Sequence, residues 1–132
     1  MAGITGKISK TLIPGSILTC ADNSGAKTIM IINRLGKSGR KGGLRHAGIG
    51  DIVIASVKTG TPAYRKKKVR AIIIRQKHPL RRLNGLHVRF EDNAAILITE
   101  TGLPVGTEVK GAVAREVIEK NIKLASVASR VV

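Results

Sequence analysis

The stretch from Arg65 to Ile98 most constrains how this chain can fold, because it joins two apolar blocks through a strongly basic connection. The blocks, residues 69–74 and 94–98, are rich in β-branched residues, which favour strands. The connection holds the pair Asn84-Gly85, which is typical of a tight hairpin turn. Burying an unpaired charge is very costly, so the tip of this hairpin must stay outside the core. The stretch therefore predicts a buried hairpin whose cationic tip, residues 75–86, faces a negatively charged partner.

Three further apolar segments, residues 16–21, 28–32 and 51–57, precede the hairpin and are predicted to be strands. The first two are joined by Asp22-Asn23-Ser24-Gly25, a strong turn signal because Asp and Asn form Asx turns and glycine accepts a positive φ. In the turn before the last strand, Asp92 is expected to cap backbone donors. Five strands with glycine turns predict a mainly β fold, a small five-stranded β-barrel with a short C-terminal helical region.

The pattern changes after Thr99. Residues 107–114 are ambiguous, whereas residues 112–120 favour one short helix with its valines on one face and Glu116 away from that face. Another helical turn is an option within residues 121–129. The C-terminal part is therefore expected to carry whatever helix the chain has.

A length of 132 residues and an apolar content of 42% predict a single domain with its own core. We expect an N-terminal arm at residues 1–15, the barrel at 16–99, and a C-terminal loop with short helices at 100–132. Cys20 is the only cysteine, so it allows no internal disulfide and is interpreted as a small buried hydrophobe. No apolar run reaches the roughly 18–20 residues of a membrane span, and no secretory pattern begins the chain. A cytoplasmic protein without a membrane partner is expected.

The positive charge is concentrated in the middle of the chain. The net charge is +16, and residues 34–90 hold 16 of the 24 lysines and arginines against one acid, Asp51. Such a field indicates a polyanionic partner, and an aromatic content of 2% favours folded RNA over single strands. The predicted RNA-binding residues lie in three groups: Lys37, Arg40, Lys41 and Arg45 in the loop 34–50; Arg65, Lys66, Lys67, Lys68 and Arg70 in and after the connection 58–68; and Arg75, Lys77, Arg81 and Arg82 on the hairpin.

The loop 34–50 holds six glycines and five basic residues and has no acid. Its glycines would let the backbone approach a phosphate chain closely. The alternative is a merely solvated, flexible loop. Without RNA we expect residues 36–47 to be unordered, because like charges repel and glycine adds chain entropy.

The residues give no support for catalysis or for a cofactor. Gly36-Lys37-Ser38 imitates the end of a P-loop, but Ile31 occupies the position of the first required glycine. His46, His78 and His87 have neither a nearby cysteine nor metal-ligand spacing. No nucleophile and base form a recognisable arrangement. We therefore expect no enzyme, no metal and no cofactor.

A longer pattern runs through the same region. Ala71 to Ile74 are followed after nine residues by Asn84-Gly85, then after four by Phe90, after two by Asn93, and after two more by Ile96-Leu97. This pattern resembles the signature of the ribosomal protein fourteen family of the large subunit, although the family usually has valine at position 96. Further matches, in the family's order, are Ala21 to Ala26, Ala47 to Asp51 and Pro104 to Thr107. The arm 2–13 and the loop 37–43 resemble the archaeal and eukaryotic branch, whose eukaryotic members carry the number twenty-three in the older scheme.

The resemblance implies a five-stranded barrel that binds large-subunit rRNA in the cytoplasmic ribosome. It implies neighbouring large-subunit proteins as partners, and small-subunit rRNA at an intersubunit bridge. The C-terminal part around Thr107, Glu108, Lys120 and Asn121 resembles the protein-facing surface used by factors that block subunit joining. Two alternatives remain from the residues alone, a free-standing RNA- or DNA-binding module and a small barrel enzyme.

Overall fold

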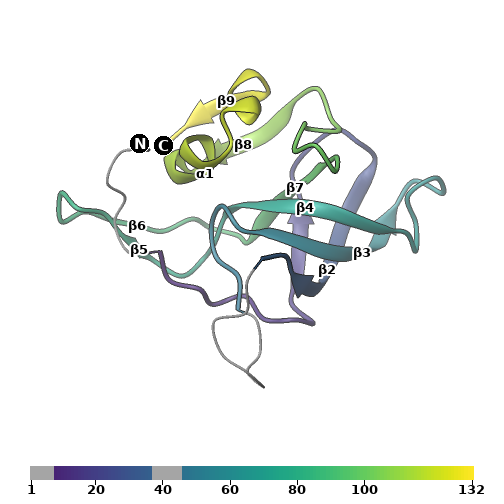
Figure 1. Cartoon of the computed structure of the whole chain (residues 1–132), viewed down its shortest axis with the longest axis horizontal. Helices are drawn as coiled ribbons and strands as arrows, with labels where there is room; N and C mark the ends of the chain where they lie inside the picture. Colours follow the sequence, from purple (N-terminus) through teal and green to yellow (C-terminus); the bar gives the residue numbers. More distant parts are fainter. Residues whose placement is uncertain (1–7, 37–45) are drawn as a thin grey trace.

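Five strands close into a barrel in the order β1-β2-β3-β4-β7 (Figure 1). The computed structural model describes residues 8–36 and 46–132. β1 and β7 pair in parallel, and the other neighbouring strands of the barrel are antiparallel. The predicted mainly β fold, a five-stranded barrel with a short C-terminal helical region, is confirmed. The barrel strands are β1 Ile17–Cys20, β2 Ala26–Arg34, β3 Ile52–Gly60, β4 Lys68–Arg75 and β7 Ala94–Ile98.

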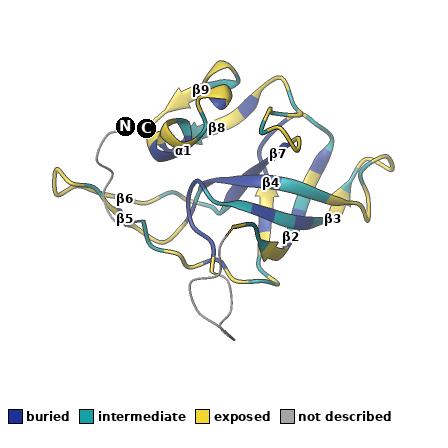
Figure 2. Ribbon diagram, in the orientation of Figure 1, coloured by how far each residue is buried: buried dark blue, intermediate teal, exposed yellow. Residues whose placement is uncertain are grey.

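The core of the barrel is aliphatic, as the composition requires. Along β3, Val53, Ala55 and Val57 are buried and the residues between them are less so, which is the alternation of a strand with one face inward. Residues 71–74 of β4 and 94–98 of β7 are instead buried at every position. Because successive strand residues point to opposite faces, both faces of β4 and β7 are covered there. Figure 2 shows this burial along β7 and part of β4.

The predicted hairpin is confirmed in its two walls, since β4 and β7 pair antiparallel. Its charged connection forms a two-stranded ribbon of its own, β5 Leu80–Arg81 with β6 His87–Val88. The ribbon projects from the barrel at the left of Figure 1. Across its turn the Arg82 N–H donates to the Leu86 carbonyl, and Gly85 has a φ of 85°, which glycine adopts without steric cost.

The C-terminal part lies over the barrel beside β4 and β7 (Figure 1). The segment 107–114, ambiguous in the sequence, contains a strand, and the expected helix 112–120 begins three residues later. A helical turn is present at 122–126, but the strand that follows it was not predicted. This last strand pairs in parallel with β8. The elements are β8 Val109–Val113, α1 Arg115–Lys120, the 3-10 helix η1 Ile122–Ser126 and β9 Ala128–Val131. Within the two described ranges, no helix combines the length and apolar character needed to cross a membrane.

Candidate nucleic-acid interface

The connection between β3 and β4 presents a run of exposed cations. Arg65, Lys66, Lys67 and Lys68 are exposed, and none of them pairs with an acid of the described residues. Lys66 has a φ of 64°, and its N–H donates to a carbonyl of β3, so the run is bent into a sharp turn. Arg70, farther along β4, is half-buried. The turn therefore holds four cationic side chains in solvent at one end of the barrel.

The β5–β6 ribbon presents cations at the other end of β4. Lys77 and Arg81 are exposed and form no ion pair within the described part of the chain. Leu83 and Leu86, 65% and 61% exposed, flank the turn itself. Figure 1 places this ribbon and the β3–β4 connection at opposite ends of the long axis of the molecule. Cations that are close in sequence are thus separated by the length of a strand.

Arg75 is held inside the molecule rather than offered to solvent. Its Nε lies 2.6 Å from Asp92 Oδ1 and its Nη2 lies 3.2 Å from Asp92 Oδ2. Its Nη1 donates to the carbonyls of Lys110 and Ala112 at 3.0 and 2.9 Å. Arg75 therefore joins the base of the hairpin to β8. The expectation that Asp92 caps backbone donors is wrong, because its carboxylate accepts from this guanidinium; the neighbouring Asn93 accepts from a backbone N–H instead.

Arg82 has a similar internal role. Its Nε and Nη2 donate to the two carboxylate oxygens of Glu116 at 2.9 and 3.3 Å, and Nη2 also donates to the Val132 carbonyl at 2.6 Å. Glu116 is only 4% exposed, which corrects the expectation that it lies away from the buried face of the helix. A buried carboxylate requires such a partner. The pair fastens the β5–β6 ribbon to α1.

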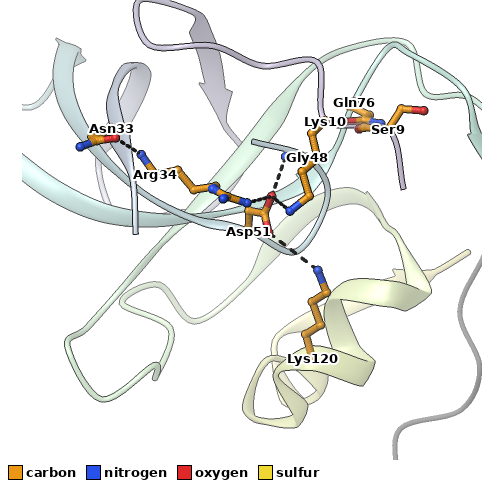
Figure 3. A network of polar contacts seen from close by, with 8 residues as sticks. All are labelled: Ser9, Lys10, Asn33, Arg34, Gly48, Asp51, Gln76 and Lys120. Carbon is orange, nitrogen blue, oxygen red and sulfur yellow. Dashed lines mark hydrogen bonds and ion pairs between the residues drawn. The ribbon is translucent and has the colours of Figure 1, made fainter. Parts of the chain in front are cut away.

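Asp51, the one acid in the basic region, lies among three cations (Figure 3). Its carboxylate is 3.3 Å from Lys10 Nζ, 3.7 Å from Arg34 Nη1 and 3.8 Å from Lys120 Nζ. It also accepts from the Gly48 N–H at 2.9 Å. These partners come from the segment before β1, from the end of β2 and from α1. Asp51 therefore fixes the place where three parts of the chain meet.

The four residues expected at a protein-facing surface lie around one loop. Thr107 and Glu108 are exposed and are positioned by Asn23, whose side-chain oxygen accepts from both of their N–H groups. Asn121 donates to the carbonyl of Gly102 in the same loop at 2.9 Å. Lys120 is exposed but directed to Asp51. The structure thus connects the end of α1 with the loop that leads to Thr107.

Cys20 and Asp22 form a buried structural cluster, and the predicted burial of Cys20 is confirmed. Asp22 accepts from the Cys20 thiol, from the Ser24 N–H and hydroxyl, and from the Leu97 N–H of β7. The bond to Ser24 is the Asx turn that the sequence predicted. Burial, reinforced by the hydrogen bond to Asp22, raises the pKa of the Cys20 thiol to about 12. Among the described residues, no group of histidine, cysteine and acidic side chains could hold a metal.

Some of the predicted site residues are not described by the structure, and some exposed cations were not predicted from the sequence. The loop residues Lys37, Arg40, Lys41 and Arg45 fall outside the described residues, as does most of the segment 36–47 that was expected to be unordered. The last residue of that segment, Ala47, is described, and it is buried and pairs with Leu12. Arg89 and Arg130 are exposed cations that the sequence reasoning did not select. Arg89 lies in the basic region and could have been included. Arg130 gave no signal, because the strand that carries it was not predicted.

Comparison with known proteins identifies the family. A family model described as ribosomal protein L14p/L23e matches residues 11–132. The chain belongs to this family. Curated members named large ribosomal subunit protein uL14 match over all 132 residues, with both chains fully covered. The L14p/L23e proteins of Methanothrix thermoacetophila, Thermoplasma acidophilum and Methanocorpusculum labreanum are 48%, 47% and 46% identical. These relatives are archaeal, in agreement with the resemblance of the chain to the archaeal and eukaryotic branch.

Proposed function

We propose that this chain is a structural constituent of the large ribosomal subunit, without enzymatic activity, and that it binds the folded rRNA of that subunit. The family is the basis for the subunit. The observation that carries rRNA binding is the run Arg65 to Lys68, four exposed cations without an acidic partner in the described chain. Lys77 and Arg81 add a second contact at the β5–β6 ribbon, and the loop residues 37–45 are proposed to add a third.

Two of the residues predicted to contact RNA, Arg75 and Arg82, have a structural role in this proposal. Arg75 and Arg82 already satisfy carboxylates of their own chain, so releasing them to RNA would leave Asp92 and Glu116 without those partners. Glu116 is buried, and leaving a buried charge unpaired costs several kcal/mol, of the order of 3–5. The Asp92 side chain is 39% exposed, and Arg75 is held in addition by its hydrogen bonds to two carbonyls of β8. We therefore assign Arg75 and Arg82 to positioning the ribbon, and Arg81 to the rRNA contact.

The proposal is tested by charge reversal in the β3–β4 turn. In the variant Lys66→Glu/Lys67→Glu, affinity for protein-free large-subunit rRNA should fall, and the slope of log affinity against log salt should decrease by about 1 for each lysine. Lys123→Glu is the matched control, since Lys123 is exposed in η1 and belongs to neither cationic group. Equal slopes for the turn variant and the wild type would count against rRNA binding at this turn.

The place of the protein in the cell is a separate test. A constituent of the large subunit should co-sediment with large subunits after high-speed centrifugation of an extract. The alternative, a free-standing RNA- or DNA-binding module, predicts a slowly sedimenting protein that is found apart from them.

The surface of Thr107, Glu108, Lys120 and Asn121 supports a further part of the proposal. We assign to it contacts with neighbouring large-subunit proteins and the interface with the small subunit, including an rRNA bridge and a subunit anti-association factor. Its support is the ordered loop and the near-neutral charge of this third, where residues 91–132 hold five basic and six acidic residues. Glu108→Lys with Thr107→Arg should lower subunit joining in light-scattering assays, whereas unchanged joining would remove this surface from the interface.

A further inference from the structure

A recess lies where the chain leaves the β5–β6 ribbon and passes below the C-terminal strands. It consists of a cleft of about 620 Å³ and a second cleft of about 440 Å³, and Arg89, Phe90 and Glu91 line both of them. Gly111 and Arg130, from β8 and β9, are among the other residues that line the larger cleft. Volumes of this size are typical of sites for small organic molecules, about 300–1,000 Å³.

At the bottom of the recess, the guanidinium of Arg75 is held in place and its charge is neutralised within the protein. Arg75 lines the larger cleft, and Asp92 and two carbonyls of β8 hold its guanidinium. Gly111 has a φ of 81°, and a Cβ there would lie 2.7 Å from Arg75 Nη1. The guanidinium therefore fills the space that a side chain at position 111 would take.

The rim carries a surplus of positive charge. Arg89, Arg130 and Lys77 are exposed and have no acidic partner in the described part of the chain. Of the two acids among the lining residues, Asp92 pairs with Arg75, whereas Glu91 is exposed and has no basic partner in the described part of the chain. The rim can thus hold an anion and still offer one carboxylate as a hydrogen-bond acceptor.

Phe90 gives the recess an aromatic wall. It is the only phenylalanine of the chain, and it is half-buried because it packs against the core. A phenylalanine fixed in this way is suited to stack with a planar ring, and base–aromatic stacking is tolerant of base identity. An aromatic ring, guanidinium groups for phosphate and a carboxylate that accepts from an exocyclic amine are together the chemistry that recognises a nucleotide.

We propose that this recess binds one unstacked nucleotide of the rRNA, with its base against Phe90 and its phosphate at Arg89 and Arg130. The identity of the RNA rests on the proposed function above. Because Tyr64 is the only other aromatic residue and lies in the β3–β4 connection, the recess is a site for a single nucleotide and not the beginning of a single-strand channel.

The test is photochemical crosslinking of the full chain bound to protein-free large-subunit rRNA. After irradiation with ultraviolet light and digestion, the peptide that contains Phe90 should carry a nucleotide adduct. Phe90→Leu should abolish this adduct and weaken rRNA binding roughly tenfold, as expected for the loss of one stacking contact. Tyr64→Leu is the control, and it should leave the Phe90 adduct in place. Since Phe90 contacts the core, the surface variant Arg89→Ser/Arg130→Ser, which should also reduce the adduct, is measured in parallel.

The outcomes separate this inference from the proposed function. Normal rRNA binding with adducts only near residues 65–68 or 81 would overturn the recess and leave the proposed function intact. Loss of all rRNA binding by the wild type would overturn both. Adenosine monophosphate, added to the free protein and followed by NMR, distinguishes a free nucleotide from RNA as the source. Perturbation of Arg89 to Glu91 by this probe without an rRNA adduct would make the recess a site for small nucleotides, which would also overturn the proposal.

Discussion

The thiol of Cys20 links the stability of the protein to pH. In the folded chain burial raises its pKa to about 12, whereas in the unfolded chain it has the ordinary value near 9.0. The unfolded state therefore loses this proton first as the pH rises. Below the ordinary thiol pKa, Cys20 should not lower the free energy of unfolding. As the pH rises from there toward 12, the free energy of unfolding should fall progressively. Denaturant titrations of the wild type and Cys20→Ala between neutral and alkaline pH measure the difference; a parallel pH dependence of the two proteins would refute the prediction.

Arg81 and Arg82 are adjacent, but truncating them should affect different properties of the protein. Arg82→Ala leaves the buried carboxylate of Glu116 without its partner, so the free energy of unfolding should fall by about 3–5 kcal/mol. Arg81→Ala removes an exposed side chain, and its effect on stability should stay within about 0.5 kcal/mol, while rRNA binding weakens. Urea unfolding checks both values. If Arg82→Ala proved as stable as Arg81→Ala, the Arg82–Glu116 pair would not fasten the ribbon.

At the scale of elements, the sequence predicted the strands, turns and helix whose formation depends on residues close together in the chain. The hairpin walls, the Asx turn at Asp22 and the short helix follow from apolar periodicity and turn chemistry within a few residues. The internal roles of Arg75 and Arg82 do not, because their partners lie 17 and 34 residues farther along the chain. The strand β9 was missed for the same reason: its sequence is partly polar, and it is a strand through pairing with β8. In the candidate site, exposed cations were predicted by composition, whereas the recess at Phe90 exists only after β8 and β9 have packed beside it.

The β5–β6 ribbon should be the most easily opened of the described strand pairs. A two-stranded ribbon is marginally stable alone, and this one has two paired positions and exposed leucines at its turn. In the free protein its amides should exchange with deuterium much faster than those of β4 and β7. Binding to rRNA should slow the exchange of the ribbon selectively. Exchange measured by mass spectrometry tests this, and equal protection of ribbon and barrel in the free protein would contradict it.

At the scale of the whole molecule, the two described cationic ends predict independent contacts with rRNA. Lys66→Glu/Lys67→Glu changes one end and Arg81→Glu the other, and β4 separates them. Effects of distant, unconnected sites add to within about 0.5 kcal/mol. The triple variant should therefore lose the sum of the two binding free energies, measured in filter-binding titrations. A triple variant no weaker than either parent would indicate that both ends meet the same contact on the RNA.

The parallel pairing of β1 with β7 has a consequence for the polypeptide before it is assembled. An open sheet would present unpaired N–H and C=O groups, which can recruit strands from other copies and start fibrous deposits. Closure of the ring leaves the barrel without such a template. The barrel of a free molecule is consequently protected from β-type self-association by its backbone topology, and the mutually repelling charges of the molecules act in the same direction.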